Sequence, residues 1–265
     1  MSSNALPGEW LPSYQRVSRR APRGALSLAF SPITVDSVAS GYNRTMFSTS
    51  ELFDAAGLPA ELQGLVTDGL PWEVLARLDA FLAEVRDGRH GDVHPTAVVT
   101  GPVYLAPGAS IGPHACVRGP AWIGAGADVD HGAYLRGGVV LAPGAHVGHA
   151  SEVKHSLLLS GAKAPHFNYV GDAVLGRDVN LGAGVKIANL NTFGTAVKVA
   201  GQDTGLRKFG AAVGDGVSIG CNAVLAPGTV VGPRVVVYHG AMLRGVVPAD
   251  TIVKLRPTLE HAPRH

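Results

Sequence analysis

Residues 105–129 read LAPGAS IGPHAC VRGPAW IGAGAD V, and an aliphatic residue opens each group of six. A helix has a period of about 3.6 residues and an alternating strand a period of about two, so neither explains a period of six. Three short strands joined by tight turns do explain it, and eighteen residues then complete one coil of a solenoid. The period holds without a polar member at Val93, Val99, Leu105, Ile111, Val117, Ile123, Val129, Leu135, Leu141, Val147, Val153 and Leu159.

The residues between these positions support the same coil. Four residues after an aliphatic residue stands a second, small residue, as at Ala109 and Ala127, and Gly often follows the aliphatic residue directly. A small side chain fits the narrow corner of a three-sided prism, and Gly tolerates corner dihedrals. The chain is 46% hydrophobic but only 6% aromatic, which suits a core of Val, Leu, Ile and Ala. The sequence predicts an all-β fold, a parallel β-helix.

The period is interrupted twice. It resumes at Tyr169 and continues to Ile187, so we expect Leu159 and Tyr169 to point inward and the residues between them to leave the prism. It is lost again after Ile187 and returns at Val213. Residues 188–209 are predicted to be an inserted loop with a small hairpin. A loop of this length in a regular solenoid is usually functional.

The chain of 265 residues divides into four predicted segments. Residues 1–47 are expected to be a poorly ordered extension and residues 48–90 a helical cap. Residues 91–247 form the β-helix with its inserted loop, and residues 248–265 form a C-terminal tail without a readable pattern.

The segment 48–90 is predicted to form three short helices. Ser48 and Glu51 have the spacing of a capping box, which starts the first helix. A second helix is expected over residues 60–66, and Pro71 suits the first turn of a third. We expect this unit to cover the first coil, which otherwise exposes a core cross-section and a strand edge. The apolar stripe of the third helix consists of Trp72, Leu75, Leu78, Leu82 and Val85.

Charge and cysteine content narrow the class of protein. The net charge is only +2, so no nucleic-acid partner is expected. The two cysteines, Cys116 and Cys221, lie far apart without metal-site spacing, which favours a reduced, cytoplasmic protein. No apolar run approaches the ~20 residues of a membrane span, so no membrane association is expected.

Two basic residues, Arg136 and Lys154, stand eighteen positions apart, so they are expected to stack on one face of adjacent coils. Stacked cations repel each other unless an anion joins them, and the pair is therefore a candidate phosphate clamp. The alternative is a pair of solvated surface charges, with Lys154 pairing locally with Glu152.

His166 lies in the first interruption of the period, and we expect it to project outward beside Tyr169. A neutral imidazole accepts a proton near neutral pH, which makes His166 a candidate general base. A lone histidine is otherwise a structural hydrogen-bonding group. Asn180 and Asn189 are outward amides that say little by themselves, because Asn is common in solenoid corners.

Several of these residues belong to runs that match a known family. Without a gap in their mutual spacing, they resemble the acetyltransferase half of the bifunctional bacterial glucosamine-1-phosphate acetyltransferase / N-acetylglucosamine-1-phosphate uridyltransferase. The resemblance implies a left-handed hexapeptide-repeat β-helix, acetyl-CoA as co-substrate, and a homotrimer with sites between neighbouring subunits. The matching runs are Arg136, EVK (152–154), KAPHFNYVGDA (163–173), NLGAGV (180–185) and Asn189.

The resemblance also implies a role for each matched position. His166 would be the general base that deprotonates the amine of an amino-sugar phosphate, and Asn189 would orient the sugar and the acetyl group. A backbone N–H would meet the thioester oxyanion, and no metal is predicted for the acyl transfer. The sugar phosphate would be held by Arg136, Lys154, Tyr169 and Asn180, and the acetyl-CoA channel would be lined by Ala183 and Cys221.

The chain departs from the family pattern in two places. It contains no Gly-rich nucleotide loop of the uridyltransferase half, so uridyl transfer is not expected of this chain. After Asn189 the family has an aromatic-Asp-Gly run and a Lys, where this chain has Leu190, Asn191 and Thr192. The inserted loop is also longer. These departures bear on the identity of the sugar acceptor, so the acceptor could equally be a nucleotide amino sugar.

Two other functions fit parts of the pattern. His131 and His149 are eighteen residues apart, with His114 and His155 nearby, which allows a zinc site of the γ-carbonic anhydrase type. A non-catalytic solenoid that binds a sugar nucleotide or organises a partner enzyme is the second alternative.

Overall fold

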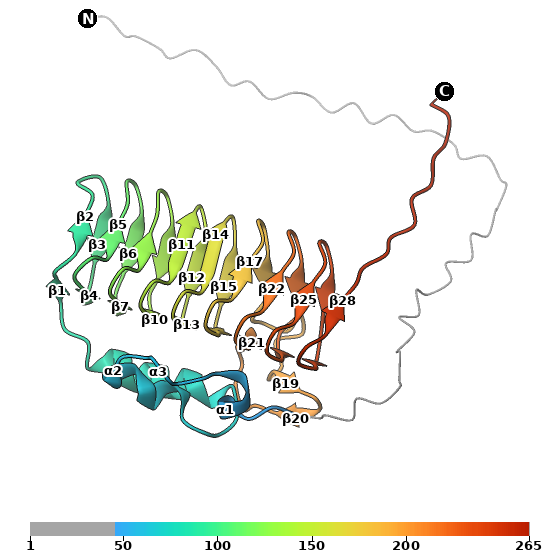
Figure 1. The fold of residues 1–265 in the computed structure, drawn as a ribbon, viewed down its shortest axis with the longest axis horizontal. Coiled ribbons are helices and arrows are strands. Elements are labelled where there is room, and N and C mark those ends of the chain that lie inside the picture. The colour runs from blue at the N-terminus through green and yellow to red at the C-terminus, as the bar shows by residue number, and fades with distance from the viewer. Residues whose placement is uncertain (1–45, 265) are drawn as a thin grey trace, which may run out of the picture. The chain divides into compact units, whose positions relative to one another are not determined.

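A computed structural model describes residues 46–264, and most of the predicted extension, residues 1–45, lies outside them. Three parallel sheets wind around one axis, so that each complete coil contributes a strand to each sheet (Figure 1). The predicted fold class, a left-handed parallel β-helix, is confirmed. Within residues 46–264, no helix is long and apolar enough to span a bilayer.

The chain visits the sheets in the order A, B, C. Sheet A contains β1 (Gly88–Arg89), β4 (Val103–Leu105), β7 (Ala121–Ile123), β10 (Val139–Leu141), β13 (Ser156–Leu158), β16 (Val174–Leu175), β21 (Ala211–Val213), β24 (Thr229–Val231) and β27 (Val246–Val247). Sheet B contains β2 (Asp92–Val93), β5 (Ser110–Ile111), β8 (Asp128–Val129), β11 (His146–His149), β14 (Lys163–His166), β17 (Asn180–Leu181), β22 (Ser218–Ile219), β25 (Val236–Val237) and β28 (Ile252–Val253). Sheet C contains β3 (Val98–Thr100), β6 (Cys116–Arg118), β9 (Tyr134–Arg136), β12 (Glu152–Lys154), β15 (Tyr169–Gly171), β18 (Lys186–Ile187), β23 (Val224–Leu225) and β26 (Met242–Leu243). We call the line of turns between sheets B and C the B–C edge, and the line between sheets C and A the C–A edge.

Two coils in the middle of the solenoid are one residue short. Leu141 pairs with Leu158, and Leu158 pairs with Leu175, so each of these coils has seventeen residues instead of eighteen. Leu158 and Val170 therefore fill the interior, and the prediction that Leu159 and Tyr169 point inward is wrong. Since two single-residue deletions follow each other, counting in sixes loses the phase here although the coil is unbroken.

The residues around His166 stay within the prism. They form β14, which pairs with β11 on one side and β17 on the other. The expectation that the backbone leaves the regular path is therefore wrong. His166 is exposed because it is the last residue of a sheet B strand, at the B–C edge.

The helices form as the sequence predicts. The capping box between Ser48 and Glu51 is present at the start of the first helix. The predicted apolar stripe of Trp72, Leu75, Leu78, Leu82 and Val85 is buried throughout. The elements are α1 (Thr49–Leu52), α2 (Ala60–Gln63), the 3₁₀ helix η1 (Gly64–Val66) and α3 (Glu73–Ala83).

We expected the helices to cover the first coil, but they lie along the side of the solenoid, on the outer face of sheet A (Figure 1). The physical reason is that this face carries apolar residues outward as well as inward. Burying each such side chain contributes roughly 1.5–3 kcal/mol before entropy costs, which favours a helical cover over solvent. The outward residues packed against the helical unit are Trp122, Val140, Leu157, Val174, Ala212 and Val230.

The inserted loop is anchored at its base. As predicted, it contains a small hairpin, formed by β19 (Lys198–Val199) and the antiparallel β20 (Gln202–Asp203). Val197 and Phe209 are fully buried, and the Phe209 ring meets the edge of Trp72 at a centroid distance of 6.4 Å. The base of the loop is therefore packed against the helical unit. The predicted tail also contributes a strand, β28.

Candidate active site

Three predicted site residues stack in a column on the B–C edge. The carbonyl of His166 accepts a hydrogen bond from the Gly184 N–H at 2.9 Å, and the carbonyl of Ala183 accepts one from the Asn222 N–H at 2.9 Å. These bonds place His166, Ala183 and Cys221 at equivalent turns of successive coils. The backbone N–H of Ala183 donates to no acceptor among residues 46–264. The column thus offers a basic imidazole beside a free N–H donor and a small side chain.

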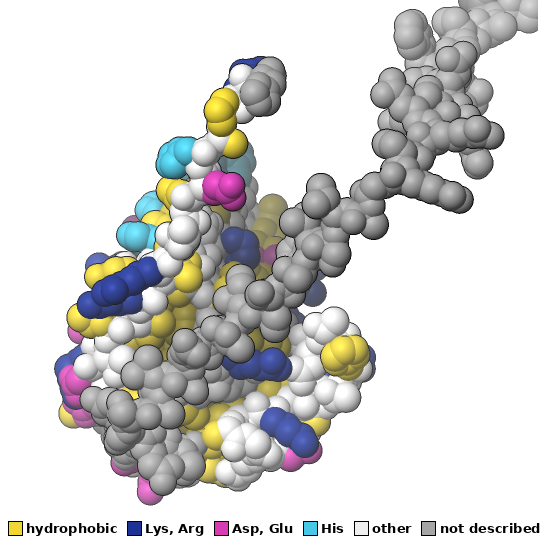
Figure 2. Space-filling view, turned by 90° about the vertical axis from the view of Figure 1, so that its right-hand side faces the viewer, with side chains coloured by type: hydrophobic (Ala, Val, Ile, Leu, Met, Phe, Trp, Pro, Cys, Tyr) yellow, Lys and Arg dark blue, Asp and Glu magenta, His cyan; other side chains and the backbone are white. Residues whose placement is uncertain are grey.

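A ladder of rings lies on the N-terminal side of this column. His131 and His149 stack with ring centroids 4.8 Å apart, and Phe167 meets His149 edge-on at 5.4 Å. Histidine side chains (cyan) are visible on the upper part of the solenoid in Figure 2. Of the two further candidate zinc ligands, His114 meets His131 edge-on at a ring-centroid distance of 5.9 Å, whereas His155 follows β12 at the C–A edge and does not join this group within residues 46–264.

The two basic residues meet at the C–A edge, as expected. The pairing of Val153 with Leu135 sets Lys154 beside Arg136 at the ends of β12 and β9. Each cation already has a carboxylate partner. The Arg136 guanidinium lies 2.7 Å from Glu152, while Lys154 pairs with Asp172 rather than with the local Glu152. The repulsion expected between stacked cations is therefore relieved within the protein.

Asp172 is the centre of this cluster, with only 3% of its surface exposed. Lys154 Nζ donates to both carboxylate oxygens at 3.1 Å, His155 Nδ1 lies 2.7 Å from Oδ1, and Asn189 donates from its side-chain amide. Burial by itself raises the pKa of this carboxyl, but the bonds from His155, Asn189 and Lys154 outweigh burial and hold the pKa below its ordinary value. Asp172 is thus a charged acceptor that orients three neighbours.

His155 links the cluster to the helical unit. Its Nδ1 faces Asp172, and its Nε2 lies 2.9 Å from Asp79 Oδ1 on α3. Ionised carboxylates only accept hydrogen bonds, so this geometry favours the imidazolium form, in which both ring nitrogens carry a proton. The hydrogen bond to Asp172 and the attraction of Asp79 outweigh partial burial and raise the pKa of His155.

The raised pKa of His155 predicts a pH-dependent stability. Its contribution is complete below the ordinary histidine pKa of about 6.5, and it is lost as the pH rises through the raised folded-state value. We expect the free energy of unfolding, measured by urea denaturation across this window, to fall more steeply with pH in the wild type than in His155→Gln. His261→Gln, in the exposed C-terminal segment, serves as the control and should keep the wild-type slope. Equal slopes in the wild type and His155→Gln would contradict the role of the imidazolium.

Tyr169 and Asn189 join the C–A cluster, whereas Asn180 does not. Asn189 Nδ2 lies 3.4 Å from Tyr169 Oη, and partial burial raises the pKa of this tyrosine. The two side chains fill the space beside Gly171, where an added Cβ would lie 2.7 Å from the Asn189 amide nitrogen and 2.8 Å from Tyr169 Oη. Asn180 pairs with Lys163 on sheet B, so within one chain it is on a different face.

Sequence reasoning missed three members of the cluster. Asp172 lies inside the matched run 163–173, but the sequence indicated no role for it. The sequence suggested His155 only as a zinc ligand. Asp79 lies in a helix whose position was predicted wrongly. In the seventeen-residue register Lys154 pairs with Gly171 and Asp172 falls beside His155, a neighbour that an eighteen-residue count hides; the same count does align Asp172 with Lys154.

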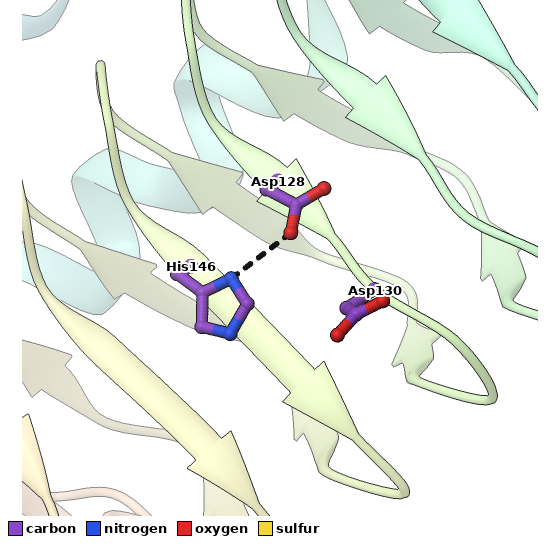
Figure 3. Close-up of side chains that lie close together, drawn as sticks. All are labelled: Asp128, Asp130 and His146. Atoms are coloured by element: carbon purple, nitrogen blue, oxygen red, sulfur yellow. Dashed lines mark hydrogen bonds and ion pairs between the residues drawn. The ribbon is translucent and has the colours of Figure 1, made fainter.

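One further group could hold a metal ion. Asp128, Asp130 and His146 come from the neighbouring strands β8 and β11 and the turn after β8, with His146 Nδ1 3.0 Å from Asp128 (Figure 3). Their candidate ligand atoms lie within 4.8 Å of one another. Asp128 also accepts a hydrogen bond from Ser110, so this outward row on sheet B is already hydrogen-bonded without an ion.

The chain is similar to several known proteins. A family profile described as the GMPPB C-terminal domain matches residues 117–204. The bifunctional protein GlmU of Methanococcus maripaludis (strain C7 / ATCC BAA-1331) is 43% identical over 197 residues, covering 73% of this chain and 48% of that protein. The bifunctional sugar-1-phosphate nucleotidylyltransferase/acetyltransferase of Sulfurisphaera tokodaii is 43% identical over 96 residues, covering 35% and 24%. The acetyltransferase domain of PglB from Neisseria gonorrhoeae FA1090 overlaps 62% of this chain and 54% of its own, with a TM-score of 0.30 and 18% identity.

The fold and the repeat define a hexapeptide-repeat, acyltransferase-like protein. Within that class, the chain is a relative of the bifunctional GlmU proteins, which confirms the resemblance seen in its motifs. The chain spans about half the length of the GlmU relatives that it matches.

Proposed function

We propose that this chain is a CoA-dependent N-acyltransferase that acts on an amino sugar carrying a phosphate or a nucleotide. The observation that carries the proposal is the B–C edge column, in which an exposed imidazole, a free backbone N–H and small side chains adjoin. These are the groups that acyl transfer from a thioester needs: a base, an oxyanion donor and room for the pantetheine arm. The name of one similar protein, the bifunctional sugar-1-phosphate nucleotidylyltransferase/acetyltransferase, agrees with this class.

The proposed reaction is a direct attack without a covalent enzyme intermediate. The sugar amine attacks the thioester carbonyl carbon while His166 takes a proton from the nitrogen. The new C–N bond forms, the C–S bond breaks, and the protonated imidazole returns its proton to the departing CoA thiolate. The N–H of Ala183 is proposed to meet the oxyanion of the tetrahedral intermediate, because its hydrogen bond has no partner within the described chain.

The acceptor sugar is proposed to lie on the outer face of sheet C, between His166 and the Tyr169–Asn189 pair. Arg136 and Lys154 are the phosphate ligands that the family resemblance implies. A sugar phosphate at that position would have to displace their present carboxylate partners.

A homotrimer is proposed as the working assembly. Asn180 and the B–C edge column stand on different parts of one chain, so a site that uses Asn180 with the other predicted ligands requires a second copy. Sedimentation equilibrium of the full chain tests the assembly.

The direct test is CoA release. The full chain is incubated with acetyl-CoA and a panel of amino sugars, amino-sugar 1-phosphates and nucleotide amino sugars, and the free thiol is measured. Thiol release that depends on one acceptor class, with an acetylated product found by mass spectrometry, supports the proposal. A chain that binds these compounds without releasing thiol would instead be a non-catalytic sugar-nucleotide-binding solenoid.

A further inference from the structure

A cleft of about 860 Å³ opens between the inserted loop and the C–A edge. Cavities of roughly 300–1,000 Å³ are the usual size of small-molecule sites. One wall consists of the loop from Leu190 to Asp203, and the other of the turns at Ala226 and Arg244 on the next two coils. Leu190 directly follows Asn189, so the cleft begins where the predicted acceptor site ends.

The side chains that line the cleft include two basic residues and one acidic residue. Lys198 and Arg244 line it, and neither forms an ion pair with any residue from 46 to 264. Asp203, the acidic lining residue, lies opposite Lys198 in the β19–β20 hairpin without forming an ion pair with it, and its Oδ1 accepts a hydrogen bond from the Gly205 amide, so Arg244 is the lining cation without an acidic neighbour in its own element. Arg136 and Lys154, by contrast, are already neutralised. An incoming anion therefore gains more at the cleft than at the stacked pair.

An aromatic ring stands at the same cleft. Phe193 is 92% exposed and lines the space together with the side chains of Thr192 and Asn191. A ring held in water has no stabilising role in the fold, but it offers a flat face on which a nucleobase can stack. Asn191 Nδ2 donates to the Ala196 carbonyl at 3.0 Å, which holds the loop closed on itself.

The position of the cleft suits one end of a long ligand. The turn of Arg244 lies three coils beyond that of His166, or about 14 Å along the axis at the spacing of neighbouring strands. Crossing sheet C adds at most about 16 Å, since about five residues separate its two edges. Once the length of the exposed side chains is subtracted, a sugar joined to a nucleoside diphosphate reaches farther across this gap than a sugar 1-phosphate does.

We propose that the cleft binds the nucleoside diphosphate part of the acceptor, so that the substrate is a nucleotide amino sugar. Lys198 and Arg244 bind the diphosphate, and Phe193 stacks on the base. This inference rests on the proposed acyl transfer for its catalytic consequence, but binding can be tested without it. CoA also contains a nucleoside diphosphate, so the donor is the other possible source of the same chemistry. The column of Ala183 and Cys221 lies at the opposite edge of sheet C, which favours the acceptor.

Titration calorimetry of the full chain at constant ionic strength tests the binding. The probes are UDP, GDP and dTDP, with CoA and inorganic phosphate as separate arms. We expect a nucleoside diphosphate to bind, and Arg244→Ala and Phe193→Ala each to weaken it at least tenfold. Arg256→Ala removes an exposed arginine outside the cleft and should leave the affinity unchanged. Binding of CoA alone to this cleft, binding of phosphate as tight as that of the nucleotides, or equal affinity in Arg244→Ala would overturn the proposal.

Steady-state kinetics separates this inference from the proposed function. Arg244→Ala should raise KM for a nucleotide amino sugar at least tenfold with little change in kcat or in KM for acetyl-CoA, and Arg136→Ala should raise it less. A larger effect of Arg136→Ala, with sugar 1-phosphates as the better acceptors, would reject the inference and leave the acyl transfer intact. Arg244-dependent nucleotide binding without any acyl transfer would reject the proposed function and leave the inference intact.

Discussion

Replacing His166 with Ala is expected to lower acyl-transfer turnover about 10²–10⁴-fold, the range of a lost general base. The side chain is exposed at the end of β14, and only its backbone is part of the hydrogen-bonded coil. The melting temperature of the variant should therefore stay close to that of the wild type. Measuring kcat with saturating acetyl-CoA and acceptor, together with thermal unfolding, checks both expectations.

A matched variant of a neighbouring imidazole makes this test specific. His149 pairs in register with His166 on the adjacent coil and is also exposed. His149→Ala should keep at least about a third of the wild-type turnover, because the proposal gives this residue no proton to carry. Turnover that survives in His166→Ala, or falls equally in both variants, would exclude His166 as the base.

Replacing Asp172 with Ala is expected to cost about 3 kcal/mol of stability, the low end of the range for removing one partner of a buried ion pair. The loss leaves Lys154 and His155 without their shared acceptor, and it leaves the Asn189 amide with only the longer contact to Tyr169 Oη. The low end applies because Lys154 and His155 retain partial contact with water, at 22% and 23% side-chain exposure. The free energy of unfolding at neutral pH, from urea denaturation, gives the value.

Asp79 provides the comparison for this prediction. Its carboxylate faces the same imidazole as Asp172, but its side chain is 67% exposed. Exposed ion pairs contribute about 0–1 kcal/mol, so Asp79→Ala should cost far less than Asp172→Ala. If the two variants lose similar stability, the cluster is not organised around the buried carboxylate.

The fold was predictable because one period governs most of the chain. Eighteen-residue coils with an aliphatic residue at every sixth position allow few other structures, and small corner residues such as Ala109 and Ala127 agree with them. The side position of the helices was not predicted, although the sequence contains a signal for it. Val140 and Leu157 flank inward positions with further apolar residues, which means that both faces of sheet A are buried.

The sequence predicted which residues form the site better than it predicted the contacts between them. The exposure of His166 was expected for the wrong reason, since the residue ends a regular strand instead of leaving the prism. The pairing of Lys154 with Asp172 spans eighteen residues and agrees with spacing in sixes, whereas the contact of His155 with Asp172 spans seventeen residues and depends on a coil that is one residue short. A deletion of this kind preserves hydrophobicity and composition, so only the register of the strands reveals it.

The placement of α1–α3 limits how copies of this chain can come together. The solenoid has three sides, and one of them, sheet A, is covered by the helices and by the base of the inserted loop. A neighbouring subunit can approach the barrel of the solenoid only through sheet B, through sheet C or along the corner that they share. That corner carries the B–C edge column with His166. An oligomer with rotational symmetry that packs through this corner therefore forms its intersubunit clefts at the proposed base. Insertions and substitutions on the side covered by the helices can therefore vary without disturbing such a subunit interface.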